Sequence, residues 1–558
     1  LLLTTGVLTL SACIISPFSE HNAHPDIPLV EDAVNRTEAS ETPPIGENGN
    51  SEEDYFIGLA LSGGGSRAAN FSAAVMWQLH ELGILKEVQY ISSVSGGSLP
   101  AAYYALSQKN DSGLEWNKVK EAVSQNFEEL LVHYQVRGPG RWIQQITSSY
   151  DRTDIMAEVF EDFLYADANE RTARTEENYL ANNKSWPWAK KFSDLPRKPR
   201  LLINATNYVR GGGAFTFTNQ NFDKLHADLA RLTIGKAVAT SAAFPGLLRT
   251  STFADYSTHC QEEVGSNPKC QNGENKKYLH LFDGGVSDNL GIDTLLRVHK
   301  ELVSKKVEEK SKEAFPKGCI IIMVDAFTPY DNESDANRPD TRKWNDLFFI
   351  DMNNIGNAFN ILLQTKRRVS LERLGYDSAH LEYAVKMNKP VGFLKKMKTE
   401  SVSDDPSETK RERDILQQKR AGCKIWHIAA TQFQYMDLKR QEPAHKEVNK
   451  EVYRIYNEQL VGRYERLFNA NLPHITSKIN EYIFPRKKLR LLRELQLNHP
   501  DGLDKFAQLL GEMDTRFRIS QLDQDLLYMA AYLLVNEQTS KETICTWMEK
   551  VTGRGCKH

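Results

Sequence analysis

The sequence lacks an excess of charge of either sign. Its 558 residues include 70 Lys and Arg against 73 Asp and Glu, which leaves a net charge of −3. A protein that follows a nucleic-acid backbone would carry a basic excess or stripe, so nucleic acid is not expected as a partner. Beyond its first residues the chain also lacks the run of about 18 uncharged apolar residues that a membrane-spanning helix needs. We therefore expect a soluble body.

Cysteine is scarce, and metal-binding patterns are missing. None of the seven cysteines belongs to a CxxC…CxxC arrangement, and the sequence contains no HExxH motif. These spacings are the usual signatures of structural and catalytic zinc sites. We therefore expect no metal and no cofactor.

The first thirteen residues (LLLTTGVLTLSAC) form an apolar run that closes in small residues. Such a run is typical of the apolar region and cleavage site of a secretion signal, although the preceding basic segment is missing. The tetrapeptide LSAC at 10–13 resembles the lipobox of bacterial lipoproteins, in which the cysteine carries a lipid. This resemblance implies a membrane-surface anchor at Cys13 and a chain in the periplasm or at the cell surface. Ile14 after the cysteine favours the outer membrane, and a plain signal peptide is the alternative.

Export would favour disulfides among the six cysteines that remain when Cys13 is set aside, because the number is even and the compartment oxidising. Cys260 and Cys270 flank a polar loop (QEEVGSNPK) that cannot be fixed by packing, so this pair is the disulfide we most expect. Cys545 and Cys556 flank another short segment and also look like a local pair, whereas Cys319 and Cys423 each open an apolar run and could pair or stay as thiols. The sequence alone leaves the pairing of these four undetermined.

The order of residue patterns predicts an α/β protein with extensions at both ends. Residues 14–52 are rich in Pro, Glu, Asn, Ser and Gly, which is typical of a disordered tether. Residues 53–440 alternate between strand-like runs and helical periodicity, whereas 441–558 is almost wholly helical. With 1–13 as signal remnant and lipobox, these ranges are the expected domains. Strands are expected at 55–61, 88–93, 200–206, 278–282, 320–325 and 425–431, and the clearest helix at 67–82.

A glycine-rich segment, LSGGGSR at 61–67, ends the first expected strand and opens the clearest helix. Gly63, Gly64 and Gly65 allow a tight turn that directs several N–H groups at one point, where the helix N-terminus adds positive partial charge. Such a loop can bind a phosphate or stabilise an oxyanion. A dinucleotide loop is disfavoured, because no acidic residue ends a second strand about 20 residues later. A simple tight turn remains the alternative.

A second segment, SVSGG at 93–97, lies between an apolar run and a helix-like stretch. A strand–nucleophile–helix turn places its serine in a strained conformation and requires small residues two positions before and after it. Ser95 has this context, with Ser93 in place of the usual glycine. Ser92, Ser93 and Ser98 are also candidates, but they lack it. A serine- and glycine-rich turn without catalysis is the alternative.

The third segment is DGG at 283–285, directly after an expected strand. The carboxyl end of a strand is where open α/β sheets hold their ligands, which makes Asp283 a candidate site residue. The alternative is an aspartate that forms a turn with its own backbone.

The order GGGSR, SVSGG and DGG resembles the patatin-like phospholipase family. ATSAAFP at 239–245 and DGGVSDNL at 283–290 are similar to two further segments of that family. The resemblance covers about residues 55–325 and extends at most to 433. It implies an open, mostly parallel sheet flanked by helices, to which the chain adds its helical C-terminal extension.

The resemblance also implies a lipid acyl hydrolase that cleaves carboxylic esters with a Ser–Asp dyad, as a phospholipase A, lysophospholipase or esterase. Ser95 would attack the ester carbonyl and form an acyl-enzyme, and Asp283 would take the proton and later activate water. Arg67 would brace the glycine loop or meet a substrate phosphate. The oxyanion would be held by N–H groups of Gly63, Gly64, Gly65 and Gly96.

Two alternatives remain open from the sequence. One is an ordinary α/β-hydrolase with a Ser–Asp–His triad, for which His299, His380 or His427 could supply the histidine. The other is a surface lipoprotein that binds lipid without catalysis. The sequence leaves the acyl substrate and the oligomeric state undetermined.

Overall fold

In the computed structural model, the chain divides into two compact units. Cys13, the 14–52 tether, the Cys260–Cys270 pair and His380 lie outside the described residues. No helix in the described part combines the length and apolar character of a membrane span. The described residues are 54–109, 113–136, 150–166, 189–209, 211–245, 247–255, 277–308, 315–327, 352–374, 423–430, 506, 509–511, 513 and 516–557.

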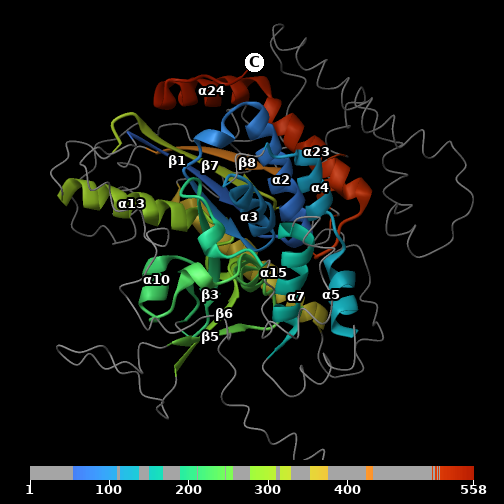
Figure 1. Ribbon diagram of the computed structural model, residues 1–558. Helices are drawn as coiled ribbons and strands as arrows, with labels where there is room; N and C mark the ends of the chain where they lie inside the picture. Colours follow the sequence, from blue (N-terminus) through green and yellow to red (C-terminus); the bar gives the residue numbers. More distant parts are fainter. Residues whose placement is uncertain are drawn as a thin grey trace, which may run out of the picture. The chain divides into compact units, whose positions relative to one another are not determined.

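The unit that contains the chain's first described strand is built on parallel strands in the order β2-β1-β7-β8 (Figure 1). Every residue of β1 after its first is buried, as expected for parallel strands that are covered on both faces. β1 begins and ends at the residues predicted from the sequence, 55 and 61. The strands are β1 (Tyr55–Leu61), β2 (Tyr90–Val94), β7 (Gly318–Asp325) and β8 (Cys423–Ala429).

Helices of the same unit pack against this sheet and against one another. α2 packs on α23 and α4, α13 on β1 and β2, and α24 on β7. α2 ends just before Gly83, whose φ of 73° is the left-handed conformation that commonly terminates a helix. The elements are α2 (Gly65–Glu81), η3 (Leu85–Glu87), η4 (Ser95–Gly97), α4 (Trp116–Val123), α13 (Ile292–Glu308), α15 (Met352–Arg373), α23 (Gln521–Asn536) and α24 (Gln538–Thr552).

The other unit contains antiparallel strands: β6 pairs with β5 and β3, and β4 pairs with β3. Its helix α11 packs on α7 and on β3. The strands are β3 (Arg200–Asn207), β4 (Gly213–Thr216), β5 (Ser251–Asp255) and β6 (Lys277–Asp283). The helices are α5 (Phe127–Val136), α7 (Arg152–Phe160), η5 (Glu161–Tyr165), η6 (Phe192–Asp194), α10 (Asn219–Asp223), η7 (Leu229–Arg231) and α11 (Ile234–Ser241). Two helices, α3 (Ser98–Ser107) and α12 (Gly285–Asp288), run from one unit into the other.

The predicted α/β class, with parallel strands flanked by helices, is confirmed. All six expected strands are present, and β4 and β5 are additional. β4 is only four residues long and its first two residues are exposed, so it lacks the buried alternation from which strands are recognised.

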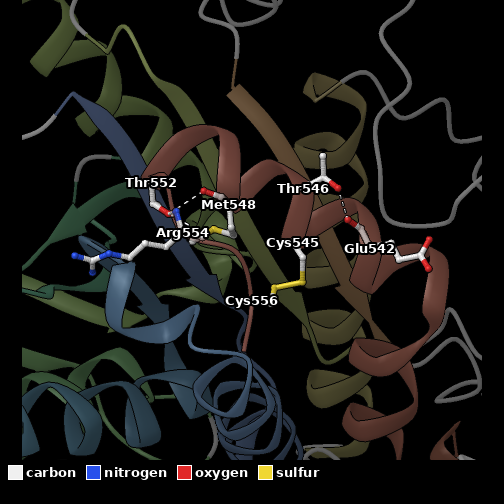
Figure 2. The surroundings of a disulfide bond; sticks show 7 residues. All are labelled: Glu542, Cys545, Thr546, Met548, Thr552, Arg554 and Cys556. Carbon is white, nitrogen blue, oxygen red and sulfur yellow. Dashed lines mark hydrogen bonds between the residues drawn. A yellow bond between two sulfur atoms is a disulfide. The ribbon is translucent and has the colours of Figure 1, made fainter. Parts of the chain in front are cut away.

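Two disulfides settle pairings that the sequence left open. Cys319 and Cys423 are cross-strand partners on β7 and β8, with Cα atoms 4.4 Å apart. Cys545 of α24 is bonded to Cys556 of the C-terminal tail, with a Cα separation of 5.2 Å (Figure 2). Both bonds lie in the unit of parallel strands. One joins β7 to β8, and the other joins α24 to the C-terminal tail.

Candidate active site

The glycine loop lies between β1 and α2 and is fixed by backbone hydrogen bonds. The N–H of Gly63 donates to the Asn289 carbonyl over 2.9 Å, and that of Ser62 to the Val324 carbonyl over 3.0 Å. Gly64 and Gly65 have φ values of 136° and 57°, which side-chain-bearing residues rarely adopt. Because the Gly63 N–H is already engaged, the donors that this loop can offer to an anion are those of Gly64 and Gly65. These two N–H groups have no hydrogen-bond partner among the described residues.

Ser95 follows β2 at the start of η4 and has a φ of 49°. A positive φ is costly for a serine, and it is the conformation that a nucleophile turn between strand and helix imposes. The two following glycines lie directly on the glycine loop. A Cβ on Gly96 would overlap the Gly65 carbonyl oxygen, and one on Gly97 would lie 2.6 Å from the Ser62 carbonyl oxygen. The structure thus brings the SVSGG turn and the glycine loop into contact.

Asn289 is a residue of this site to which the sequence reasoning gave no role. Its carbonyl accepts the Gly63 N–H, and a Cβ on Gly63 would lie 2.5 Å from its side-chain oxygen. The buried carboxylate of Asp288 holds the turn by accepting the N–H groups of Leu290, Gly291 and Asp293. Burial raises the pKa of Asp288. The last three residues of the DGGVSDNL segment, 288–290, therefore anchor the glycine loop.

Asp283 ends β6 and belongs to the unit with antiparallel strands, whereas Ser95 belongs to the unit of parallel strands. The residue is buried, and its carboxylate Oδ1 accepts the N–H of Gly285 over 2.7 Å. That bond is the backbone turn given above as the alternative role for this aspartate, and it orients the carboxyl group. The N–H of Asp283 donates to the Ala243 carbonyl, and the hydroxyl of Thr206 donates to the Asp283 carbonyl over 2.8 Å.

The ATSAAFP segment has a structural role at Asp283. It spans the end of α11 and the turn after it, where the Ser241 carbonyl accepts the N–H of Gly284 and the Ala243 carbonyl that of Asp283. The hydroxyl of Ser241 donates to the Asn204 carbonyl on β3 over 2.5 Å. These bonds hold the DGG turn between α11 and β3.

Arg67 is 5% exposed, and its guanidinium donates to the Met513 carbonyl over 2.9 Å. Of its two predicted roles, bracing the loop agrees with this contact, which joins the loop to the C-terminal part of the chain.

The described histidines of the alternative triad lie in other surroundings. His299 on α13 contacts Phe315 and Phe56, and Phe56 is at the start of β1, about 16 Å along the strand from the glycine loop. Burial lowers the pKa of His299 to about 4. His427 on β8 contacts Asp325 over 3.1 Å, and β8 is three strand spacings, about 14 Å, from β2. Neither position favours a histidine base for Ser95.

One group of side chains among the described residues has the spacing of metal ligands. The ligand atoms of His299, Cys319 and Cys423 lie within 4.8 Å of one another. The two sulfur atoms are joined in a disulfide, so they are not available as thiolate ligands.

Residues 59–296 match the model of the family described as "Patatin-like phospholipase". No curated protein sequence matches the chain.

Among solved structures, human GIVD cytosolic phospholipase A2 is similar over 90% of this chain and 61% of its own, with 10% identity and a TM-score of 0.40. VipD from Legionella pneumophila is similar over 86% of this chain and 90% of its own, with 12% identity and a TM-score of 0.24. The chain thus spans 61% of the length of the human phospholipase.

Proposed function

We propose that the protein is a lipid acyl hydrolase that cleaves carboxylic esters through Ser95 and Asp283, because residues 59–296 match the patatin-like phospholipase family model. The observation that carries the proposal is the contact of the Ser95 turn with the glycine loop. Ser95 has a positive φ, and Gly96 packs on Gly65 so closely that no side chain fits. Acyl transfer requires a strained serine beside N–H donors at a helix N-terminus, and those of Gly64 and Gly65 have no partner in the described part of the chain.

In the proposed reaction the hydroxyl of Ser95 attacks the ester carbonyl and transfers its proton to Asp283. The tetrahedral oxyanion accepts hydrogen bonds from the N–H groups of Gly64, Gly65 and Gly96, at the positive end of α2. Asp283 then returns the proton to the leaving alcohol, and the acyl group remains on Ser95. A water molecule, deprotonated by Asp283, attacks the acyl-enzyme, and the fatty acid leaves as the Ser95 hydroxyl is restored.

The proposal is tested with purified protein and a panel of four acyl compounds: a phospholipid, a lysophospholipid, a neutral ester and an acyl thioester. Wild type should hydrolyse at least one of them. Folded Ser95→Ala and Asp283→Asn should each retain less than about 1% of the rate, since a nucleophile or base contributes several powers of ten. Ser107→Ala is the matched control. Ser107 is the last residue of α3, far along the helix from the Ser95 turn, so this variant should keep full activity.

Three outcomes would contradict the proposal. Folded Ser95→Ala with more than about 1% activity would exclude the serine nucleophile. A loss in His427→Ala equal to that of Ser95→Ala would favour the triad. Lipid binding by wild type without hydrolysis of any compound in the panel would favour a binding protein.

We also propose that a lipid at Cys13 holds the protein on a membrane surface, on the strength of the LSAC tetrapeptide. Metabolic labelling with a fatty acid should mark wild type and leave Cys13→Ser unmarked. An unlabelled wild type would refute the anchor.

A further inference from the structure

The glycine loop is contacted by the C-terminal part of the chain, far outside the 59–296 domain. The buried guanidinium of Arg67 donates to the Met513 carbonyl across a sequence separation of 446 residues. The N–H of Ser66 donates to the Arg516 carbonyl over 2.7 Å. Both acceptors are backbone carbonyls, so Met513 and Arg516 lie against the start of α2.

This contact determines which backbone N–H groups of the loop remain available to an anion. The first N–H groups of a helix have no partner within the helix. Arg516 takes up the N–H of Ser66, whereas those of Gly64 and Gly65 have no partner among the described residues. The approach is close, because a Cβ on Gly65 would lie 2.5 Å from the Arg516 carbonyl oxygen.

Two buried amide side chains form a second link between α2 and the C-terminal part of the chain, about one helical turn further along α2. The Asn70 amide donates to the carbonyls of Ser66 and Val123 over 2.9 and 3.1 Å. The Gln524 amide on α23 donates to the Asn70 side-chain oxygen over 2.7 Å and to the Lys120 carbonyl over 2.8 Å. Asn70 and Gln524 are 0% and 2% exposed, so removing either amide would leave buried polar groups unsatisfied. The first turn of α2 is thus linked through Asn70 to α23.

We propose that Met513, Arg516 and Gln524 belong to the active site and hold the glycine loop in its anion-binding shape. The carbonyls of Met513 and Arg516 fix the loop directly, and Gln524 is a positioning residue that acts through Asn70. The inference rests on the proposed function, because it assigns these residues a role in stabilising the oxyanion.

Such a role has a distinct kinetic signature. Donors that are already in place stabilise the oxyanion without reorganisation, so loosening them weakens binding of the transition state. The substrate carbonyl in the ground state carries little charge and is affected less. A variant that frees the loop should therefore lower kcat and leave KM nearly unchanged.

The chain offers a matched control for stability. Asn536, near the end of α23, donates to the Gln78 side chain over 3.0 Å, near the end of α2. This bond joins the same two helices as Asn70 and Gln524 do, at the end remote from the glycine loop. Asn536→Leu should weaken the helix contact without disturbing the donors.

The test compares Gln524→Met with Asn536→Leu in the full chain, on an ester whose hydrolysis by wild type requires Ser95. Gln524→Met should lower kcat by about tenfold or more with KM within about twofold. It should weaken inhibition by a trifluoromethyl ketone, which forms an oxyanion with the serine, by a similar factor. Inhibition by the parent methyl ketone should change little. Asn536→Leu should lower the melting temperature and keep kcat within about twofold of wild type.

Equal kcat for the two variants at equal loss of stability would overturn the inference, and so would a Gln524→Met enzyme with wild-type kcat. If Gln524→Met does not fold, Gln524→Asn replaces it. Its shorter amide cannot reach both Asn70 and Lys120, so a smaller loss of kcat at unchanged KM is expected, and an unchanged kcat would overturn the inference. Failure of the proposed function would appear instead in the wild type, as hydrolysis that Ser95→Ala does not reduce.

Discussion

Gly96→Ala is the substitution whose effect follows most directly from the structure. A Cβ at this position would overlap the Gly65 carbonyl oxygen and lie 2.7 Å from its carbon and 3.0 Å from its nitrogen. All three atoms are backbone, so no side chain can rotate away, and the Ser95 turn or the glycine loop must shift. Overpacking of this kind costs about 1–3 kcal/mol of stability. Because the shift displaces the N–H groups of Gly65 and Gly96, kcat should fall by about 10²–10³, the usual effect of one lost oxyanion donor.

The assay is steady-state hydrolysis of the best ester in the panel, together with thermal unfolding. Gly113→Ala is the control, because a Cβ there meets no atom within 4 Å. It should leave both kcat and the melting temperature unchanged. A folded Gly96→Ala protein with kcat near wild type would refute the placement of the oxyanion donors at this contact.

Three further predictions concern other parts of the chain. Replacing Cys545 and Cys556 by serine should lower the free energy of unfolding by about 3 kcal/mol, the chain-entropy value for a separation of 11 residues, as read by denaturant unfolding. Burial lowers the pKa of His299 to about 4, against 6.5 in the unfolded chain, so folding stability should fall as pH decreases from about 6.5 to 4. His299→Phe should remove this loss of stability at low pH. A His299→Phe protein whose stability varies with pH as wild type does would contradict the prediction. Thr206→Val should lower kcat by about tenfold by freeing the Asp283 turn, whereas Thr206→Ser keeps the hydroxyl and should stay near wild type.

The sequence predicts the strands well where burial on both faces leaves a continuous apolar run. β1 is found with the bounds expected, and β7 differs by two residues at its start. α2 is recognisable from its apolar face and from Gly83 at its end. β4 is short and half exposed, so its residues do not stand out from a loop.

Motifs placed Ser95, Asp283 and the glycines on turns after strands, because each combines a strand end with residues that permit tight backbone geometry. Sequence motifs do not reveal hydrogen-bond partners that are far apart in the chain. Arg67 gives no sign that it bonds to Met513, since the acceptor is a backbone carbonyl that every residue has. Gln524 likewise appears as one of several polar residues in the first turns of α23, and only the tertiary contact with Asn70 indicates the role proposed for it. The Gly63 N–H donates to the backbone carbonyl of Asn289, which removes one expected oxyanion donor. This too is a contact between distant residues that sequence motifs do not reveal.

Covalent labelling tests most directly whether Ser95 is an activated nucleophile. Wild-type protein treated with an alkyl fluorophosphonate should gain one phosphonyl group, and peptide mass spectrometry should locate it on Ser95. Ser95→Ala should gain none, and Asp283→Asn should react far more slowly, because its serine lacks the proposed base. A phosphonyl group on another residue, or labelling of Ser95→Ala at the wild-type rate, would contradict the account.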